Sequence, residues 1–325
     1  MPSLSHTIEE QLPAFFRLDR YISESLNLLS RSQIKVRNLS AKINGKEVKI
    51  SKPVKQGDHL ELNWMDSPPI EIIAQDLPID IVYEDDNCVV INKAQGMVVH
   101  PGAGNRQGTL ANALYYRRLN KLDSKNKNNP ENAGCQSSVR PGIVHRLDKE
   151  TSGIIIAAYN DEAHVFLADQ FKTRKTKKTY IAIVHGTPKE TEGRIETFIT
   201  RDSRDRKKFT VGSAGKSALT FYKVIKSWNS HSLLLLRPRT GRTHQLRVHL
   251  RHIGNPVLGD PIYHCKEKRF SNALIFETSL MLHSKSLAIT LPGESERRIF
   301  TSAMPERFID IIKKLDNINL SGYTP

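Results

Sequence analysis

Two adjacent prolines, Pro68 and Pro69, interrupt the chain near its beginning. Proline lacks a backbone N–H and fixes φ, so two in succession can continue neither a helix nor a central strand. A chain of 325 residues is also long enough to form more than one hydrophobic core. We therefore expect a linker at residues 67–77, between one domain at residues 15–66 and a second at residues 78–325.

The segment before the linker has the pattern of a small α+β module. Apolar residues recur at the spacing of an amphipathic helix at Leu18, Ile22, Leu26 and Leu29. A strong hairpin signal, Asn44-Gly45, separates two short alternating segments, and a third strand is predicted at residues 59–64. Residues 1–14 show no such period, and we expect them to form a loose tail.

Two small helices followed by a hairpin, with the sequences SRSQI and ING at these places, resemble the S4 RNA-binding domain. The resemblance implies that this module helps to dock RNA. The basic residues expected on its second short helix are Arg31, Lys35 and Arg37. The alternative interpretation is a generic basic α+β subdomain.

The segment after the linker reads mostly as strands. Short apolar or alternating runs predict strands at residues 79–92, 154–158, 179–184, 217–223 and 232–236. We expect an α+β fold, with a large mixed or antiparallel sheet and flanking helices. Residues 120–139 are polar, rich in Asn and without period, which predicts an exposed, mobile insertion.

The charge balance indicates a polyanionic partner. Lys and Arg number 49 against 34 Asp and Glu, a formal net charge of +15, which favours nucleic acid. No apolar run approaches the roughly 20 residues of a spanning helix, and the N-terminus lacks the pattern of a secretory signal. The three cysteines lie too far apart to suggest a disulfide framework or a zinc pair. We expect a cytoplasmic monomer that binds RNA and no membrane.

One carboxylate, Asp148, lies between basic residues in the segment RPGIVHRLDKETSG at residues 140–153. By itself this pattern favours an Asp that caps a turn or pairs with Arg146. The sequence HRLDKETSG, however, closely resembles the motif that carries the catalytic aspartate of pseudouridine synthases of the RluA, RluC and RluD family. Further blocks match that family in order: PIDIVYEDDNCVVINKAQGMVVHP, KKTYIAIVHG, RPRTGRTHQLRVHLR and LHS.

The resemblance implies an RluD-like enzyme that isomerises uridine in RNA to pseudouridine. It assigns Asp148 as the catalytic carboxylate, Tyr180 as the active-site tyrosine and Arg242 as the arginine beside the aspartate. Arg146 would fill the space that the extruded nucleotide leaves. The RNA contacts expected in this domain are His145, Arg146, Lys207 and Lys208.

This chemistry is redox neutral and imports no group, so we expect neither a cofactor nor a metal. An ionised carboxylate beside the substrate can act as a nucleophile or as a base. An arginine nearby would keep that carboxylate ionised in a closed pocket, and its planar fork would orient it. Two alternatives stay open, namely that Arg242 contacts a phosphate and that Tyr180 is a core tyrosine.

The histidines His244, His249 and His252 invite a metal interpretation, but neither an H-E-x-x-H motif nor a cysteine pair accompanies them. The S4-like module is more typical of enzymes that act on large-subunit RNA, so the resemblance favours 23S ribosomal RNA as substrate. The alternatives are the same chemistry on tRNA, or a non-catalytic RNA-binding factor in ribosome assembly.

Overall fold

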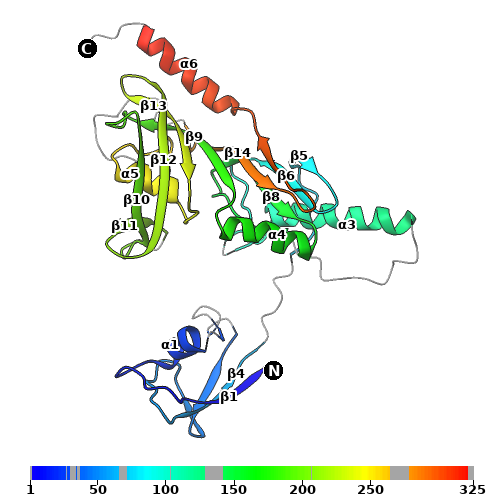
Figure 1. The fold of residues 1–325 in the computed structure, drawn as a ribbon, viewed down its shortest axis with the longest axis vertical. Helices are drawn as coiled ribbons and strands as arrows, with labels where there is room; N and C mark the ends of the chain where they lie inside the picture. Colours follow the sequence, from blue (N-terminus) through cyan, green and yellow to red (C-terminus); the bar gives the residue numbers. More distant parts are fainter. Residues whose placement is uncertain are drawn as a thin grey trace. The chain divides into compact units, whose positions relative to one another are not determined.

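The chain folds into two compact units, Met1–Glu71 and Ile72–Pro325, in a computed structural model (Figure 1). The division falls inside the predicted linker at residues 67–77. The structure describes residues 2–26, 28–29, 34, 37–65, 72–102, 104–128, 142–205, 207–263 and 278–320.

The N-terminal unit contains an antiparallel sheet in the order β1-β4-β2-β3. Its strands are β1 (Ser3–Thr7), β2 (Ser40–Ile43), β3 (Lys46–Val48) and β4 (His59–Asn63). Asn44 and Gly45 both have positive φ, as a tight hairpin turn requires, so the predicted hairpin is confirmed. Helix α1 (Leu18–Arg20) continues into the π-helical turn η1 (Tyr21–Ser25), and Leu18 and Ile22 are buried in the core.

The expectation of a loose tail is wrong for Ser3–Thr7, which pairs with β4 along its whole length. The segment SLSHT has one apolar residue, Leu4, so the alternation that marks a half-buried strand is not visible in its sequence. The pairing across the sheet, rather than the local pattern, makes this segment a strand.

The C-terminal unit is built on an 11-stranded sheet with the main path β11-β10-β12-β13-β9-β14-β8-β6-β5. Strands β15 and β7 pair with β14 and β8. Neighbouring strands are antiparallel except β14 and β8, which are parallel, so the expected large mixed sheet is confirmed. The strands are β5 (Asp80–Glu84), β6 (Cys88–Lys93), β7 (Gly142–Ile143), β8 (Ser152–Ala158), β9 (Lys177–His185), β10 (Glu192–Arg201), β11 (Phe209–Gly212), β12 (Lys216–Ser227), β13 (His231–Pro238), β14 (Leu282–Thr290) and β15 (Arg297–Thr301).

Helices flank this sheet, and Figure 1 shows α5 beside β10 and β12. They are α3 (Leu110–Asn128), α4 (Asp161–Lys172), α5 (Gln245–His252) and α6 (Glu306–Leu320). None of the helices in the described ranges is long and apolar enough to cross a bilayer.

The insertion expected at residues 120–139 needs a correction, because α3 runs to Asn128. Leu110 and Leu114 bury the first turns of α3 in the core. Extending an existing helix is far easier than starting one, so the helix continues into polar sequence that has no helical pattern of its own. Residues 129–139 of the insertion lie outside the described residues.

The strand β8 fixes the position of the segment that precedes it, which carries Asp148. All of its residues are buried, and its first two pair with His283 and Ser284 of β14. Gly153 has a φ of +111°, and a Cβ at this position would overlap the backbone of Ser284. The glycine therefore allows the backbones of β8 and β14 to meet directly, just after the segment that carries Asp148.

Candidate active site

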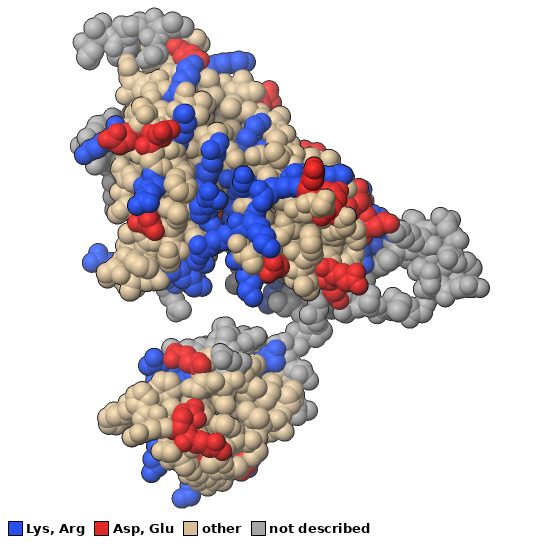
Figure 2. Space-filling view, viewed as in Figure 1, with Lys and Arg blue, Asp and Glu red and all other residues tan. Residues whose placement is uncertain are grey.

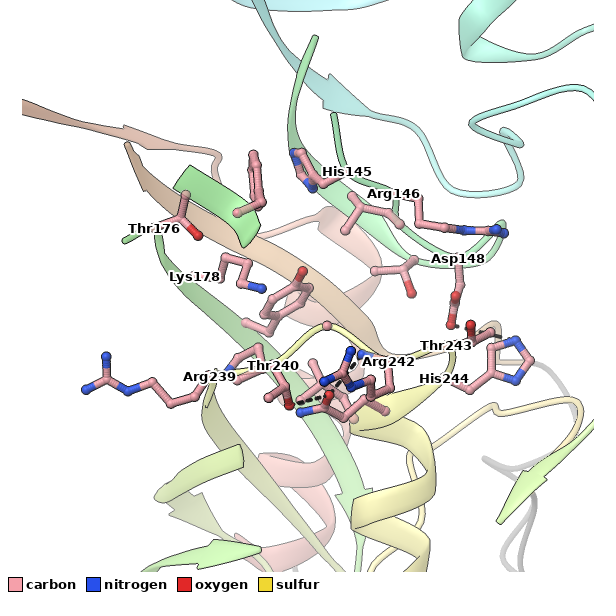
Figure 3. A pocket seen from close by; sticks show the side chains of 18 of the residues that line it. His145, Arg146, Asp148, Thr176, Lys178, Arg239, Thr240, Arg242, Thr243 and His244 are labelled. Atoms are coloured by element: carbon pink, nitrogen blue, oxygen red, sulfur yellow. Dashed lines mark hydrogen bonds and ion pairs between the residues drawn. The ribbon is translucent and has the colours of Figure 1, made fainter. Parts of the chain in front are cut away.

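A pocket of about 580 Å³ opens between the Asp148 loop, the start of β9 and the turn that leads from β13 into α5. The side chain of Asp148 points toward the part of that turn that carries Thr243 and His244 (Figure 3). Asp148 is the one acidic residue among the described residues that line the pocket. The basic residues that line it are Arg146, Lys172, Arg174, Lys178, Arg239, Arg242 and Arg247. The pocket is therefore strongly positive around a single carboxylate.

The backbone of the Asp148 loop is fixed by the turn that follows β6. The buried Lys93 donates through Nζ to the carbonyl oxygens of Met97, at 2.8 Å, and Lys149, at 3.2 Å. The N–H of Gly96 donates to the same carbonyl of Lys149 at 2.9 Å. Burial lowers the pKa of Lys93 to about 8, although the charges of Glu150 and Asp148 oppose this shift. This lysine thus connects two segments that are distant in the sequence.

Arg247, on the first turn of α5, holds the carboxylate of Asp148. Its Nη1 lies 3.3 Å from Oδ2 of Asp148, and its Nε and Nη2 each lie 2.7 Å from an oxygen of Asp260. Burial alone would raise the pKa of Asp260, but the hydrogen bonds and charge of Arg247 hold it below the ordinary carboxyl value. Asp260 therefore anchors the guanidinium in the orientation that faces Asp148.

The prediction that Arg242 lies beside the aspartate is wrong, because Arg247 takes that place. Arg242 lies in the turn before α5, and its Nε donates to the backbone oxygen of Ser217 at 2.9 Å. Its own N–H donates to Oε1 of Gln245. Both arginines line the pocket, so the motif that was expected at the pocket does lie there. Within this motif, the arginine that contacts Asp148 is Arg247 and not Arg242.

His244 approaches the same oxygen of Asp148, with Nε2 4.0 Å from Oδ2. It is the N-cap of α5 with a φ of 55°, a left-handed conformation that is costly for a residue with a Cβ. Its Nδ1 lies 2.8 Å from the hydroxyl of Tyr263, which also accepts a hydrogen bond from the N–H of Phe209. Burial lowers the pKa of His244 and raises that of Tyr263, so both are neutral near pH 7. If Tyr263 donates to Nδ1, the imidazole proton faces Asp148.

Tyr180 and His145 also line the pocket that contains Asp148. Tyr180 is buried on β9, and burial raises its pKa to about 12, so it remains a phenol at neutral pH. The ring of His145 stacks on Phe171 with centroids 4.3 Å apart, and its Nε2 accepts from the N–H of Ile156. Burial, with the nearby Lys178, lowers the pKa of His145 to about 3. His145 is therefore uncharged and contributes no cation toward RNA.

The other predicted RNA contacts are scattered. Arg146 is exposed and lines the pocket. Lys207 and Lys208 precede β11 and are not among the residues that line it; Nζ of Lys208 lies 3.5 Å from Asp205. Arg37 is half-buried in the N-terminal unit. Arg31 and Lys35 lie outside the described residues.

Two of the three histidines considered as metal ligands have other partners. Both ring nitrogens of His249 lie 3.0 Å from a threonine hydroxyl, that of Thr197 or that of Thr220. His244 contacts Tyr263 as described above. Within the described ranges, no group of three or more His, Cys, Asp or Glu side chains could hold a metal ion.

Three residues of the site were missed from the sequence, namely Arg247, Asp260 and Lys93. Arg247 stands in the same RTHQLRVH motif as Arg242, and helical spacing could have shown that it shares a face of α5 with the buried Leu250. Asp260 follows Gly259 in a loop with no pattern of its own, so no local signal marks it. Lys93 resembles a surface lysine until its burial is known.

We expect Asp260→Asn to destabilise the protein by about 3 kcal/mol at neutral pH, because it leaves the buried Arg247 without its main partner. The pKa of Asp260 is lower in the folded state than its ordinary value of 3.8. Its contribution is therefore complete above that value and is lost as the pH falls through the lowered pKa. Urea unfolding of both proteins should show a stability difference that shrinks below about pH 4.

The matched control is Asp310→Asn, which changes an exposed carboxylate on α6 and should have little effect at any pH. A difference between wild type and Asp260→Asn that stayed constant into acidic solution would contradict the ionised pair.

Known proteins resemble this chain in sequence and in fold. Residues 87–252 match the family model of RNA pseudouridylate synthase. A relative from Borreliella burgdorferi, ribosomal large subunit pseudouridine synthase D, is 43% identical over 94% of this chain and 92% of its own. The protein of the same name from Zymomonas mobilis is 36% identical over 97% of this chain and 98% of its own.

Among solved structures, human RNA Pseudouridylate Synthase Domain Containing 4 superposes with a TM-score of 0.56 at 26% identity. The match covers 73% of this chain and 93% of the human one. The chain is thus similar to these relatives across nearly its whole length, and it belongs to the RNA pseudouridine synthase family.

Proposed function

We propose that this enzyme isomerises uridines of large-subunit ribosomal RNA and that Asp148 is its catalytic carboxylate. The observation that carries the proposal is the buried Arg247, which is anchored by Asp260 and directed at Asp148 inside a pocket lined with cations. The two bacterial relatives named for the large ribosomal subunit support ribosomal RNA over tRNA. The intact ion network argues against a non-catalytic assembly factor.

The reaction breaks the bond between N1 of uracil and C1′ of ribose and forms a bond between C5 and C1′. The proton lost from C5 is matched by the one gained at N1, so the product is an isomer. A carboxylate can serve this reaction as a nucleophile or as a base. Arg247 and His244 both approach Oδ2 of Asp148, so we assign the other oxygen, Oδ1, to the substrate.

The remaining residues of the pocket suit an extruded nucleotide. A uridine within a stack hides its reacting atoms, so the enzyme must flip it into the pocket. The neutral ring of Tyr180 offers a stacking surface for the base, and the exposed Arg146 at the opening can fill the vacated space. Figure 2 shows a band of Lys and Arg side chains through the middle of the C-terminal unit, as phosphate binding requires.

We also propose that the N-terminal unit is an S4-like module that docks RNA. Its hairpin and buried helical turn support this assignment. Exposed cations of this unit are Arg17, Arg20, Lys46, Lys49, Lys52 and Lys55. Arg17 and Arg20 are paired with Asp19 and Glu24, which leaves the lysines of the hairpin region as the main phosphate contacts. Action as a cytoplasmic monomer is part of the same proposal.

The proposed function is tested by Asp148→Asn, which removes the charge and keeps the shape of the side chain. We expect no pseudouridine formation and nearly unchanged RNA affinity. Pseudouridines in ribosomal RNA should be mapped in cells that carry wild type, the variant or neither. Modified sites that persist with the variant would show that Asp148 is not catalytic. Sites found only in tRNA would show that the substrate is tRNA and not ribosomal RNA.

The two arginines of the motif should differ sharply. Arg247→Lys loses the fork that spans Asp148 and Asp260, and we expect kcat to fall roughly 100-fold. Arg242→Lys keeps a cation at the pocket wall, and we expect a change of less than about tenfold. Turnover of a synthetic RNA would measure both, with circular dichroism as the folding control. An equal fall in kcat for the two variants would favour Arg242 as a second arginine that acts on Asp148.

Removal of residues 1–71 should weaken RNA binding and leave slow conversion, because the pocket belongs entirely to the C-terminal unit. The slope of log affinity against log salt should flatten by about 0.7 to 0.9 for each phosphate that the truncated protein no longer binds. Affinity titrations at several salt concentrations would measure this slope. A folded truncated protein with an unchanged slope would contradict the docking role.

A further inference from the structure

The large sheet has a second hollow, on the face opposite α5. Thr197 of β10 and Thr220 of β12 contact His249, so they point to the face that α5 covers. Side chains alternate along a strand, so Arg194 and Phe221 point to the other face, which we call the open face. A groove of about 950 Å³ lies on the open face, across β10, β12, β13, β9, β14 and β15.

A row of side chains crosses this groove from strand to strand. Arg194 is in register with Phe221, and Phe221 with Arg237, so an aromatic ring lies between two arginines. Phe221 is 38% exposed, although a phenyl ring on a sheet face is normally covered. The guanidinium of Arg239 lies 5.9 Å from the ring centroid of Phe221. The row therefore combines an open π-surface with positive charge.

The side chains that line the groove are mostly positively charged. The cations that line it are Lys177, Lys178, Arg194, Lys223, Arg237 and Arg239. Glu192 is the one acidic residue among the described lining residues, and it lies 3.7 Å from Lys223. Glu196 lies 4.0 Å from Arg194 outside the lining. Both pairs are largely exposed and therefore weak, so a polyanion can displace them.

The groove is continuous with the catalytic pocket. Thr176, Lys178, Pro238 and Arg239 line both of them, at the start of β9 and the end of β13. A chain whose target nucleotide occupies the pocket can therefore pass these strand ends and reach the open face. Lys178 and Arg239 provide positive charge along that passage.

We propose that this groove binds a single-stranded segment of the substrate RNA next to the target uridine. One base stacks on Phe221, and phosphates lie against Arg237, Lys223 and Arg194. Aromatic rings with interleaved cations are the usual platform for single strands, because every base has a face to stack and every nucleotide a phosphate. A duplex hides its base faces and does not use such a ring. The inference rests on the proposed RNA substrate and adds a second contact surface to it.

The test uses two substrates, a short RNA that contains the target and the same RNA with a single-stranded extension on either side. Phe221→Leu removes the π-surface and keeps an apolar side chain, and Phe221→Tyr retains it. Stacking is worth about 1–3 kcal/mol per base, so Phe221→Leu should raise KM for the extended RNA by about 5- to 150-fold. Neither kcat nor KM for the short RNA should change, and Phe221→Tyr should behave as wild type.

Arg237→Ala should likewise raise KM for the extended RNA and leave KM for the short RNA unchanged. Its affinity for the extended RNA should also depend less steeply on salt concentration than that of wild type. Matched controls are Phe166→Leu, an aromatic on α4 that is 39% exposed, and Lys314→Ala, an exposed cation on α6. Equal KM changes for both substrates, or none for either, would overturn the proposal and leave the open face to another kind of partner.

Failure of the proposed function is distinguishable from failure of the groove. If wild type modified neither RNA, the isomerase assignment on this substrate would fail. The groove would then be judged by the affinity of each variant for the extended and the short RNA, measured by fluorescence anisotropy. Wild type should bind the extended RNA more tightly, and Phe221→Leu should abolish that advantage; an advantage that survived would overturn the groove.

Discussion

The guanidinium of Arg247, held between two carboxylates, is the interaction on which the site depends. A buried cation is costly unless it is paired, and Asp260 supplies a bidentate partner with both distances at 2.7 Å. With that pair complete, the remaining nitrogen of the guanidinium faces Asp148. The carboxylate of Asp148 thus lies near a positive charge that is held in place, which is how a fixed protein charge stabilises an ion inside a pocket.

The rest of the fold brings the members of this network together. The backbone of the Asp148 loop is fixed by Lys93, and the strand that follows it is held by the direct contact of β8 with β14 at Gly153. Arg247 is placed by α5, whose packing on β10 and β12 includes the contacts of His249 with two threonines. The same two strands carry Arg194 and Lys223 of the open face. One sheet therefore positions both the pocket around Asp148 and the groove of the open face.

Much of the local structure could be predicted from the sequence. Asn44-Gly45 marks its hairpin because few residues other than glycine and asparagine accept positive φ, and the apolar run Ile154-Ile155-Ile156 marks the fully buried β8. Ser3–Thr7 and residues 120–128 could not be predicted in this way. Pairing with β4 makes the first a strand, and propagation from a buried helix start makes the second helical.

The sequence by itself determined the family and the positive charge, and its short contiguous motifs predicted Asp148 and Tyr180 as residues of the site. It did not determine which of two arginines in one motif meets the aspartate. Arg242 and Arg247 are five positions apart, and only the fold places Arg242 in the turn before α5, where it contacts Ser217, and Arg247 on α5, where it contacts Asp148. Asp260 comes from a different loop, so the pairing that fixes Arg247 exists only once the chain has folded.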